Sequence, residues 1–240
     1  MLLHTSIHGD KLPQGTVCLT YDDGPGETAD SLGGPHTMEL GRFLHQEGIR
    51  ATFFVIGRHA ERFPHTLERL HGWKHIIGNH TYSHPGLVRF VQDGHDAIAE
   101  LRRTHELIAP FTNGNRIYFR PPYGNWREKS DPTGPEDAPT SVVADALNGS
   151  GLFANYVGPV LWDIVAEDWA CWREGISPKE CAERYLSETE RIGRGIILMH
   201  DSSEEDDVRP KNRTEELTKL LVPMLKRRSY RFAALDEFLR

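Results

Sequence analysis

The segment "LTYDDGP" (residues 19–25) ends an apolar run on two adjacent aspartates, followed by a Gly-Pro turn. Neighbouring residues of a strand point to opposite faces, so Asp22 and Asp23 are expected to have different tasks. Aspartate and Gly-Pro are also common at chain reversals, and this segment alone favours plain turn chemistry. The choice between these two interpretations depends on the rest of the chain.

A second candidate for chemistry is the segment "GNHTYSHPG" (residues 78–86), which places His80 and His84 four residues apart. On a helical turn, residues at this spacing lie on one face, so both imidazoles could reach one metal ion. The chain has 13 histidines, and a pair at this spacing arises easily by chance. The flanking glycines and proline, however, indicate a shaped loop rather than a core helix.

One aspartate together with His80 and His84 would form a metal site with two histidines and one carboxylate. A catalytic site keeps coordination positions open for water and substrate, whereas a structural site fills them. The other aspartate would then be the base that activates the attacking water. We therefore interpret the aspartate pair as one metal ligand and one base.

The elements that must position these residues follow from hydrophobic patterning. Short apolar runs alternate with helical patterns, which predicts a parallel sheet in an α/β barrel or an open doubly wound fold. Functional groups of both folds collect at the carboxyl ends of the strands. Strands are expected at residues 16–22, 51–56, 116–121, 158–164 and 195–201, and helices at 35–48, 96–110, 177–193 and 214–228.

The chain shows no internal repeat and no long linker, so we expect a single domain over residues 1–240. Its least regular part, residues 127–158, is expected to form a loop and a short helix over one end of the sheet. The three cysteines have no metal-site or redox spacing. The remaining histidines, among them His59, are assigned no chemistry.

Charge and hydropathy limit the partners. The net charge of −7 argues against nucleic acid or an anionic membrane as a partner. No segment approaches the ~20 apolar residues of a membrane span. The first residues carry no visible secretory signal, so we expect a cytoplasmic protein if Met1 is the natural start, and a secreted one if a leading segment has been removed.

With these residues assembled, the chain resembles the polysaccharide deacetylase family (chitooligosaccharide deacetylase homology, carbohydrate esterase family 4) over about residues 15–238. The similarity rests on "LTYDDGP", "HTYSH", "RPPYG", "EDW" and "LMH", in that order. It implies a distorted (β/α) barrel and a divalent metal, Zn²⁺ before Co²⁺, Ni²⁺ or Mn²⁺. The implied reaction is hydrolysis of an N-acetyl group on an acetamido sugar or oligosaccharide, with release of acetate.

The resemblance also implies a task for single residues. Asp22 would be the base, and Asp23 would join His80 and His84 as metal ligand. Arg120 would orient the base, and His200 would be the acid that protonates the leaving amine. The backbone N–H of Tyr123 would stabilise the oxyanion, and the residues implied to contact the substrate are Pro122, Tyr123, Trp169 and Leu198.

The fourth motif departs from the family pattern. The family usually has an aspartate three residues before the Asp-Trp pair, and this chain has Val165 there. Asp163, on the same face of the expected strand, or Asp168 could instead supply the anion that keeps His200 protonated.

Two other functions stay open. A related metal hydrolase could act on a non-sugar amide or imide, or on an O-acetyl ester. A non-catalytic sugar-binding protein could use the same scaffold, and the altered fourth motif favours it. The complete set of base, acid and ligands speaks against it, because a binding protein needs no base and acid pair.

Overall fold

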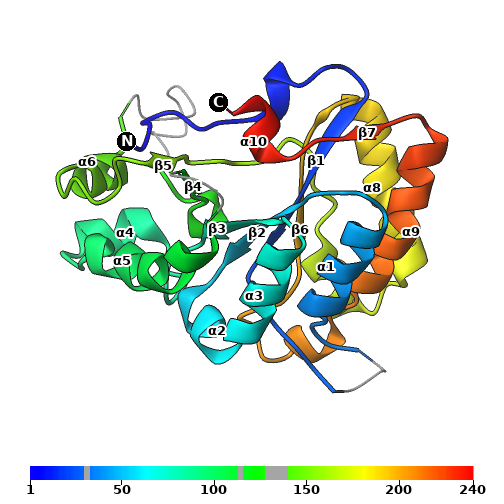
Figure 1. Cartoon of the computed structure of the whole chain (residues 1–240), viewed down its shortest axis with the longest axis horizontal. Coiled ribbons are helices and arrows are strands. Elements are labelled where there is room, and N and C mark those ends of the chain that lie inside the picture. Colours follow the sequence, from blue (N-terminus) through cyan, green and yellow to red (C-terminus); the bar gives the residue numbers. More distant parts are fainter. Residues whose placement is uncertain (30–32, 113–115, 128–139, 240) are drawn as a thin grey trace.

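The structure, a computed structural model, describes residues 1–29, 33–112, 116–127 and 140–239. At its centre lies a parallel sheet with strand order β3-β2-β1-β6, and β7 pairs with the first residues of β1 (Figure 1). Because all pairs are parallel, the carboxyl ends of the strands meet at one edge. The strands are β1 (Thr16–Asp22), β2 (Thr52–Val55), β3 (Ile76–Asn79), β6 (Gly195–His200) and β7 (Arg231–Phe232).

Two shorter strands, β4 (Ile117–Tyr118) and β5 (Tyr156–Val157), form a second parallel pair. An isolated bridge joins the end of β3 to Phe119, and the segment 158–164 runs from there to β6, which it meets at Ile164. The sheet therefore closes into the distorted (β/α) barrel that the family resemblance implied.

The strand predicted at residues 158–164 is wrong as a regular element. The segment forms only isolated bridges, at Val160 and Ile164. Pro159 has no N–H to donate, so it interrupts a hydrogen-bonded ladder at this point.

The sequence of β1 explains how it delivers a carboxylate to the interior. All of its residues are buried, which fits a strand covered on both faces. Tyr21 faces the helices, where its ring stacks on Phe53 at 5.1 Å. Cys18 belongs to a separate apolar cluster inside the barrel, and Thr20 and Asp22 follow on its face of the strand. The alternation therefore brings Asp22 to the inner side of the carboxyl edge.

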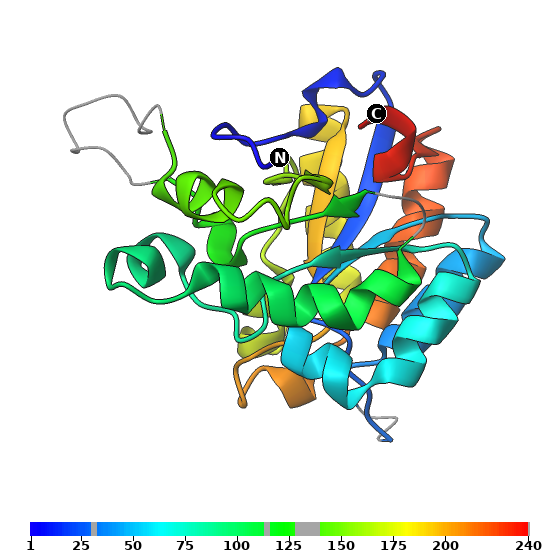
Figure 2. The ribbon, with the colours of Figure 1, turned by 60° about the vertical axis from the view of Figure 1, so that its left-hand side comes forward.

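Helices surround this sheet (Figures 1 and 2). The pair α8 and α9 lies on one side, and α4, α5 and α6 gather on the other (Figure 1). Their bounds are α1 (Thr37–Gln46), α2 (Gly57–Arg62), α3 (Pro64–Gly72), α4 (Leu87–Gln92), α5 (Ala97–Ile108), α6 (Val142–Asn148), α7 (Asp168–Glu174), α8 (Pro178–Ile192), α9 (Thr214–Arg227) and α10 (Leu235–Phe238). The described residues also contain 3-10 turns at Gly9–Lys11, Ala109–Phe111, Pro122–Gly124 and Arg209–Lys211. Within the described ranges, no helix is long and apolar enough to cross a bilayer.

The four predicted helices correspond to α1, α5, α8 and α9. At the start of α8, the Ser177 side chain accepts a hydrogen bond from Glu180 N, and Gly193 ends the helix with a φ of 85°. In the irregular segment 127–158, α6 is the expected short helix, and residues 128–139 lie outside the described part of the chain. The three cysteines are free and buried.

Candidate active site

Both aspartates of the pair line one cavity of about 430 Å³, at the carboxyl edge of the sheet. Asp22 is the last residue of β1, and its carboxylate points inward with the alternation. Asp23 has left the strand and has a φ of 73°, in the left-handed region. This turn brings the second carboxylate into the same cavity, whereas a continued strand would have turned it to the other face.

Asp23, His80 and His84 form a cluster that could bind a metal ion. Their ligand atoms all lie within 4.8 Å of one another. Asp23 Oδ1 is 3.2 Å from His84 Nε2 and 3.6 Å from His80 Nε2. All three side chains are at most 11% exposed, so water competes little for these atoms.

The backbone that carries the two histidines is a loop after β3, as the flanking glycines and proline indicated, and it is not a helical turn. Thr81 and His84 have φ values of 68° and 62°, which no α-helix contains. Side chains shape the loop instead: Asn79 Oδ1 accepts from Thr81 N, and Thr81 Oγ1 accepts from His84 N. Glu100 of α5 accepts hydrogen bonds from the two backbone N–H groups that lie between Thr81 and His84.

The donors of this cluster fit a divalent metal. His80 Nδ1 donates to the carbonyl of Arg120 at 2.7 Å, which leaves the lone pair of Nε2 directed at the cluster. Burial lowers the pKa of His80 to about 4, so its imidazole is neutral as a metal ligand must be. Burial disfavours the Asp23 carboxylate, yet His84 and the other histidines keep its pKa below the ordinary range. Asp23 Oδ1 and His84 Nδ1 belong to a small set of buried side-chain atoms in the described residues that have no hydrogen-bond partner.

Arg120 fixes one oxygen of Asp22. Its Nη1 donates to Asp22 Oδ1 at 2.7 Å and to Thr20 Oγ1 at 2.9 Å, and its Nε donates to Val160 O. Asp22 Oδ2 lies 3.6 Å from His80 Nε2 and so faces the metal cluster. One oxygen of the carboxylate is thus anchored, and the other is directed at the cavity.

His200 is paired with Asp168, one of the two candidates from the sequence. Asp168 Oδ1 lies 2.8 Å from His200 Nδ1, and Oδ2 accepts from His200 N at 2.7 Å. Tyr185 and Thr214 donate to the same buried carboxylate. Burial disfavours the imidazolium of His200, but Asp168 outweighs it and raises the pKa of His200 to about 10. His200 is therefore charged at neutral pH.

The assignment of Asp163 to this site is wrong. Its Oδ2 accepts hydrogen bonds from Gly9 N and Ile196 N, both at 2.8 Å, and its Oδ1 lies near His8. The carboxylate therefore stabilises the N-terminal segment against β6 and does not line the cavity. The alternation rule misplaced it because the segment 158–164 is not a regular strand.

The cavity also has an apolar side, formed by Trp162, Val165, Trp169 and Leu198. Trp169 and Leu198, which the resemblance implied as substrate contacts, thus line this cavity, and the contact itself stays a prediction. Tyr123 lines the cavity with a φ of 59°, and its ring lies 4.6 Å from that of His84. The expectation that Pro122 contacts the substrate is not met, because this residue is buried outside the cavity lining.

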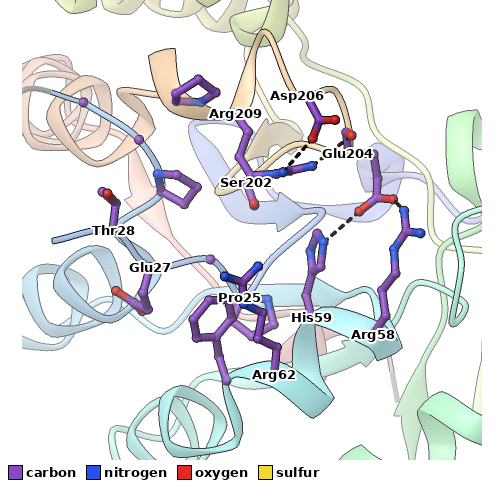
Figure 3. A pocket seen from close by; sticks show the side chains of 16 residues that line it. Pro25, Glu27, Thr28, Arg58, His59, Arg62, Ser202, Glu204, Asp206 and Arg209 are labelled. Atoms are coloured by element: carbon purple, nitrogen blue, oxygen red, sulfur yellow. Dashed lines mark hydrogen bonds and ion pairs between the residues drawn. The ribbon is translucent and has the colours of Figure 1, made fainter. Parts of the chain in front are cut away.

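Sequence reasoning missed His59 and Glu204. They line a neighbouring cavity of about 590 Å³, shown in Figure 3, and Glu204 also lines the cavity that contains the two aspartates. No spacing connects two residues 145 positions apart, and "SEEDD" (203–207) looks like a solvated loop. Only the fold brings them together.

Comparisons with known proteins find similarity to deacetylases. A sequence model of the family "Polysaccharide deacetylase" matches residues 9–133, which is more than half of the chain. A peptidoglycan-N-acetylglucosamine deacetylase of Bacillus cereus is 37% identical over 108 residues, which span 45% of this chain and 36% of that protein. A chitooligosaccharide deacetylase of Bradyrhizobium is 28% identical over 239 residues, 96% of this chain and 93% of that one. The chain is also similar to the crystal structure of a peptidoglycan N-acetylglucosamine deacetylase, with a TM-score of 0.70 and 25% sequence identity. The match covers 95% of this chain and 90% of the chain in that crystal structure.

Proposed function

This chain belongs to the polysaccharide deacetylase family, and we propose that it hydrolyses the N-acetyl group of an acetamido sugar or oligosaccharide. The observation that carries the proposal is one cavity that contains an anchored carboxylate, a metal-type cluster and a charged histidine. The named activities of the relatives support the same chemistry and the same class of substrate.

We propose Zn²⁺ as the ion, with Co²⁺, Ni²⁺ or Mn²⁺ as alternatives. Two imidazoles and one carboxylate are a usual catalytic ligand set for zinc. Asp23, His80 and His84 would bind it. When bound, the ion would polarise the acetyl carbonyl and lower the pKa of the attacking water.

In this proposal Asp22 is the base. Its Oδ2 takes a proton from the attacking water, while the hydrogen bond from Arg120 to Oδ1 keeps the carboxylate in place. The backbone N–H of Tyr123 would stabilise charge that develops on the carbonyl oxygen.

His200 is the proposed acid. Asp168 accepts the hydrogen bond from Nδ1–H of His200, so the proton that can be transferred to the substrate is the one on Nε2. That proton passes to the amide nitrogen as the C–N bond breaks, and acetate and a free amine leave. Trp169 and Leu198 supply an apolar wall for the acetyl methyl group.

A substrate panel tests this function. Acetate release would be measured from N-acetylglucosamine oligomers, O-acetylated sugars and non-sugar acetamides under the same conditions. We expect release from the N-acetylated oligomers. Release only from esters or non-sugar amides would favour the related-hydrolase alternative, and sugar binding without any release would favour the binding protein.

A further inference from the structure

His59 of α2 contacts the backbone of the proposed metal ligand Asp23. Its Nδ1 lies 2.7 Å from the Asp23 carbonyl oxygen, and its Nε2 lies 2.8 Å from Glu204 Oε1. Arg58 forms an ion pair with the same glutamate, as Figure 3 shows. The side chains of His59 and Glu204 are only 13% and 14% exposed, so this contact is largely shielded from water.

The contact matters because Asp23 has an unfavourable backbone conformation. A non-glycine residue in the left-handed region is strained, and it persists only where its surroundings fix it. Three consecutive carbonyls of this turn each accept one hydrogen bond: Asp22 O from Asp201 N, Asp23 O from His59 Nδ1, and Gly24 O from Ile56 N. Only the bond at Asp23 comes from a side chain.

The geometry defines which atom of His59 does this. A carbonyl oxygen can only accept, so Nδ1 carries a hydrogen in either protonation state of the ring. Nε2 then faces Glu204, and the ion pair with Arg58 fixes the position of that carboxylate. The hydrogen bond through Nδ1 thus orients the imidazole toward Asp23, and Nε2 lies at ion-pair distance from Glu204.

We propose that His59 is a positioning residue for the metal cluster. Through Nδ1 it keeps the Asp23 peptide in the conformation that directs Oδ1 at His80 and His84. This inference rests on the proposed function, because it assigns Asp23 to a metal.

Two amide substitutions test the contacts of the two His59 nitrogens independently. The amide nitrogen of His59→Asn can lie near the position of Nδ1 and donate to Asp23 O. That of His59→Gln reaches the position of Nε2 and can contact only Glu204. His59→Leu removes both contacts. A matched control is His71→Leu, because His71 Nδ1 contacts the carbonyl of Phe111 at 2.9 Å in the same way, away from the cavity.

Affinity for Co²⁺ and Zn²⁺ would be measured by competition with a chelator, together with the visible absorption spectrum of the Co²⁺ form. Loss of a group that orients a ligand typically lowers metal affinity by about 10- to 100-fold. We expect this loss and an altered spectrum for His59→Leu and His59→Gln. His59→Asn should retain most of the affinity and the wild-type spectrum, as should His71→Leu. Thermal unfolding of the metal-free variants reports whether each is folded.

The outcomes distinguish the two proposals. If the wild type binds no metal, the proposed function itself fails. If it binds metal and folded His59→Leu binds equally well with the same spectrum, the positioning role is wrong. Should His59→Leu not fold, His59→Gln decides instead, and wild-type affinity in that variant overturns the inference. An equal loss in His59→Asn and His59→Gln also overturns it, because the bond to Asp23 would then not be the cause.

Discussion

At the scale of single residues, our proposal gives two adjacent aspartates different tasks because their oxygens have different partners. Asp22 is bonded to the guanidinium of Arg120, and Asp23 lies among imidazoles. The left-handed turn at Asp23 makes this division feasible, since it turns both side chains into one cavity.

Substitution of each aspartate tests the division. Asp22→Asn should bind metal as the wild type does and lose about 10²–10⁴-fold in kcat, the usual contribution of base catalysis. Asp23→Asn should lose metal affinity, because a neutral amide replaces the anionic ligand. Metal titration and turnover of the two variants, side by side, provide the measurement. Loss of metal in Asp22→Asn but not in Asp23→Asn would reverse the assignment.

The Asp168–His200 pair leads to a prediction about pH. Asp168 raises the pKa of His200 from 6.5 to about 10, so the wild type should keep its acid protonated up to alkaline pH. Asp168→Asn removes the anion, the pKa falls, and the basic limb of kcat/KM should move to lower pH. The profile would be recorded from pH 6.5 to above pH 10, so that it includes the basic limb of the wild type. Asp163→Asn is the control, and its basic limb should stay where the wild-type limb is.

The residue types of the site could be read from the sequence, but not all of their geometry. The motifs indicated Asp22, Asp23, His80 and His84, because few other residue types bind zinc or move protons. The choice between Asp163 and Asp168 depended on a backbone that leaves the regular strand pattern, which spacing alone does not reveal.

At the scale of elements, α8 shows how far local signals reach. A serine before a proline, with a glutamate three residues later, predicted that the helix begins at Ser177. In the structure, the Ser177 side chain accepts a hydrogen bond from Glu180 N. Ser177→Ala should lower the free energy of unfolding by about 1 kcal/mol, because one N–H at the helix start loses its acceptor.

Urea unfolding of the metal-free protein measures this effect. Ser187→Ala, on the exposed face of the same helix, is the matched control. Since alanine has the higher helix propensity, that variant should be as stable as the wild type or slightly more so. Equal changes in both variants would show that the cap at Ser177 contributes nothing.

Long apolar runs were predicted well because they are buried on both faces, as in β1, β2 and β6. The strand β3 was missed: it has only four residues, one of them Gly78, and a polar end. The loop after it brings His80 and His84 together through left-handed residues rather than through a helical turn. The two imidazoles are close together as expected, but the backbone that brings them together has no helical or strand periodicity.

At the scale of the whole molecule, buried His75 links three segments. Its Nδ1 accepts from Ala51 N, and its Nε2 donates to Gly41 O. Burial lowers the pKa of His75 from 6.5 to about 4. The unfolded chain therefore takes up the proton first as the pH falls, so stability is complete above pH 6.5 and is lost towards pH 4.

The expected loss from this one group is roughly 3 kcal/mol across that interval. Urea unfolding of the metal-free protein at several pH values would measure it. His75→Phe has no proton to take up, so its stability should depend less steeply on pH than that of the wild type. If the stability of both proteins depended on pH in the same way, His75 would not be a cause of the loss of stability at low pH.

The proposal as a whole depends on a metal at Asp23, His80 and His84, together with turnover in the same cavity. The most direct measurement is acetate release from short N-acetylglucosamine oligomers by chelated enzyme and by enzyme reloaded with Zn²⁺ or Co²⁺, side by side. We predict that chelation abolishes release and that reloading restores it. Acetate release that is unaffected by chelation would contradict the account. So would a protein that binds the metal tightly but releases no acetate.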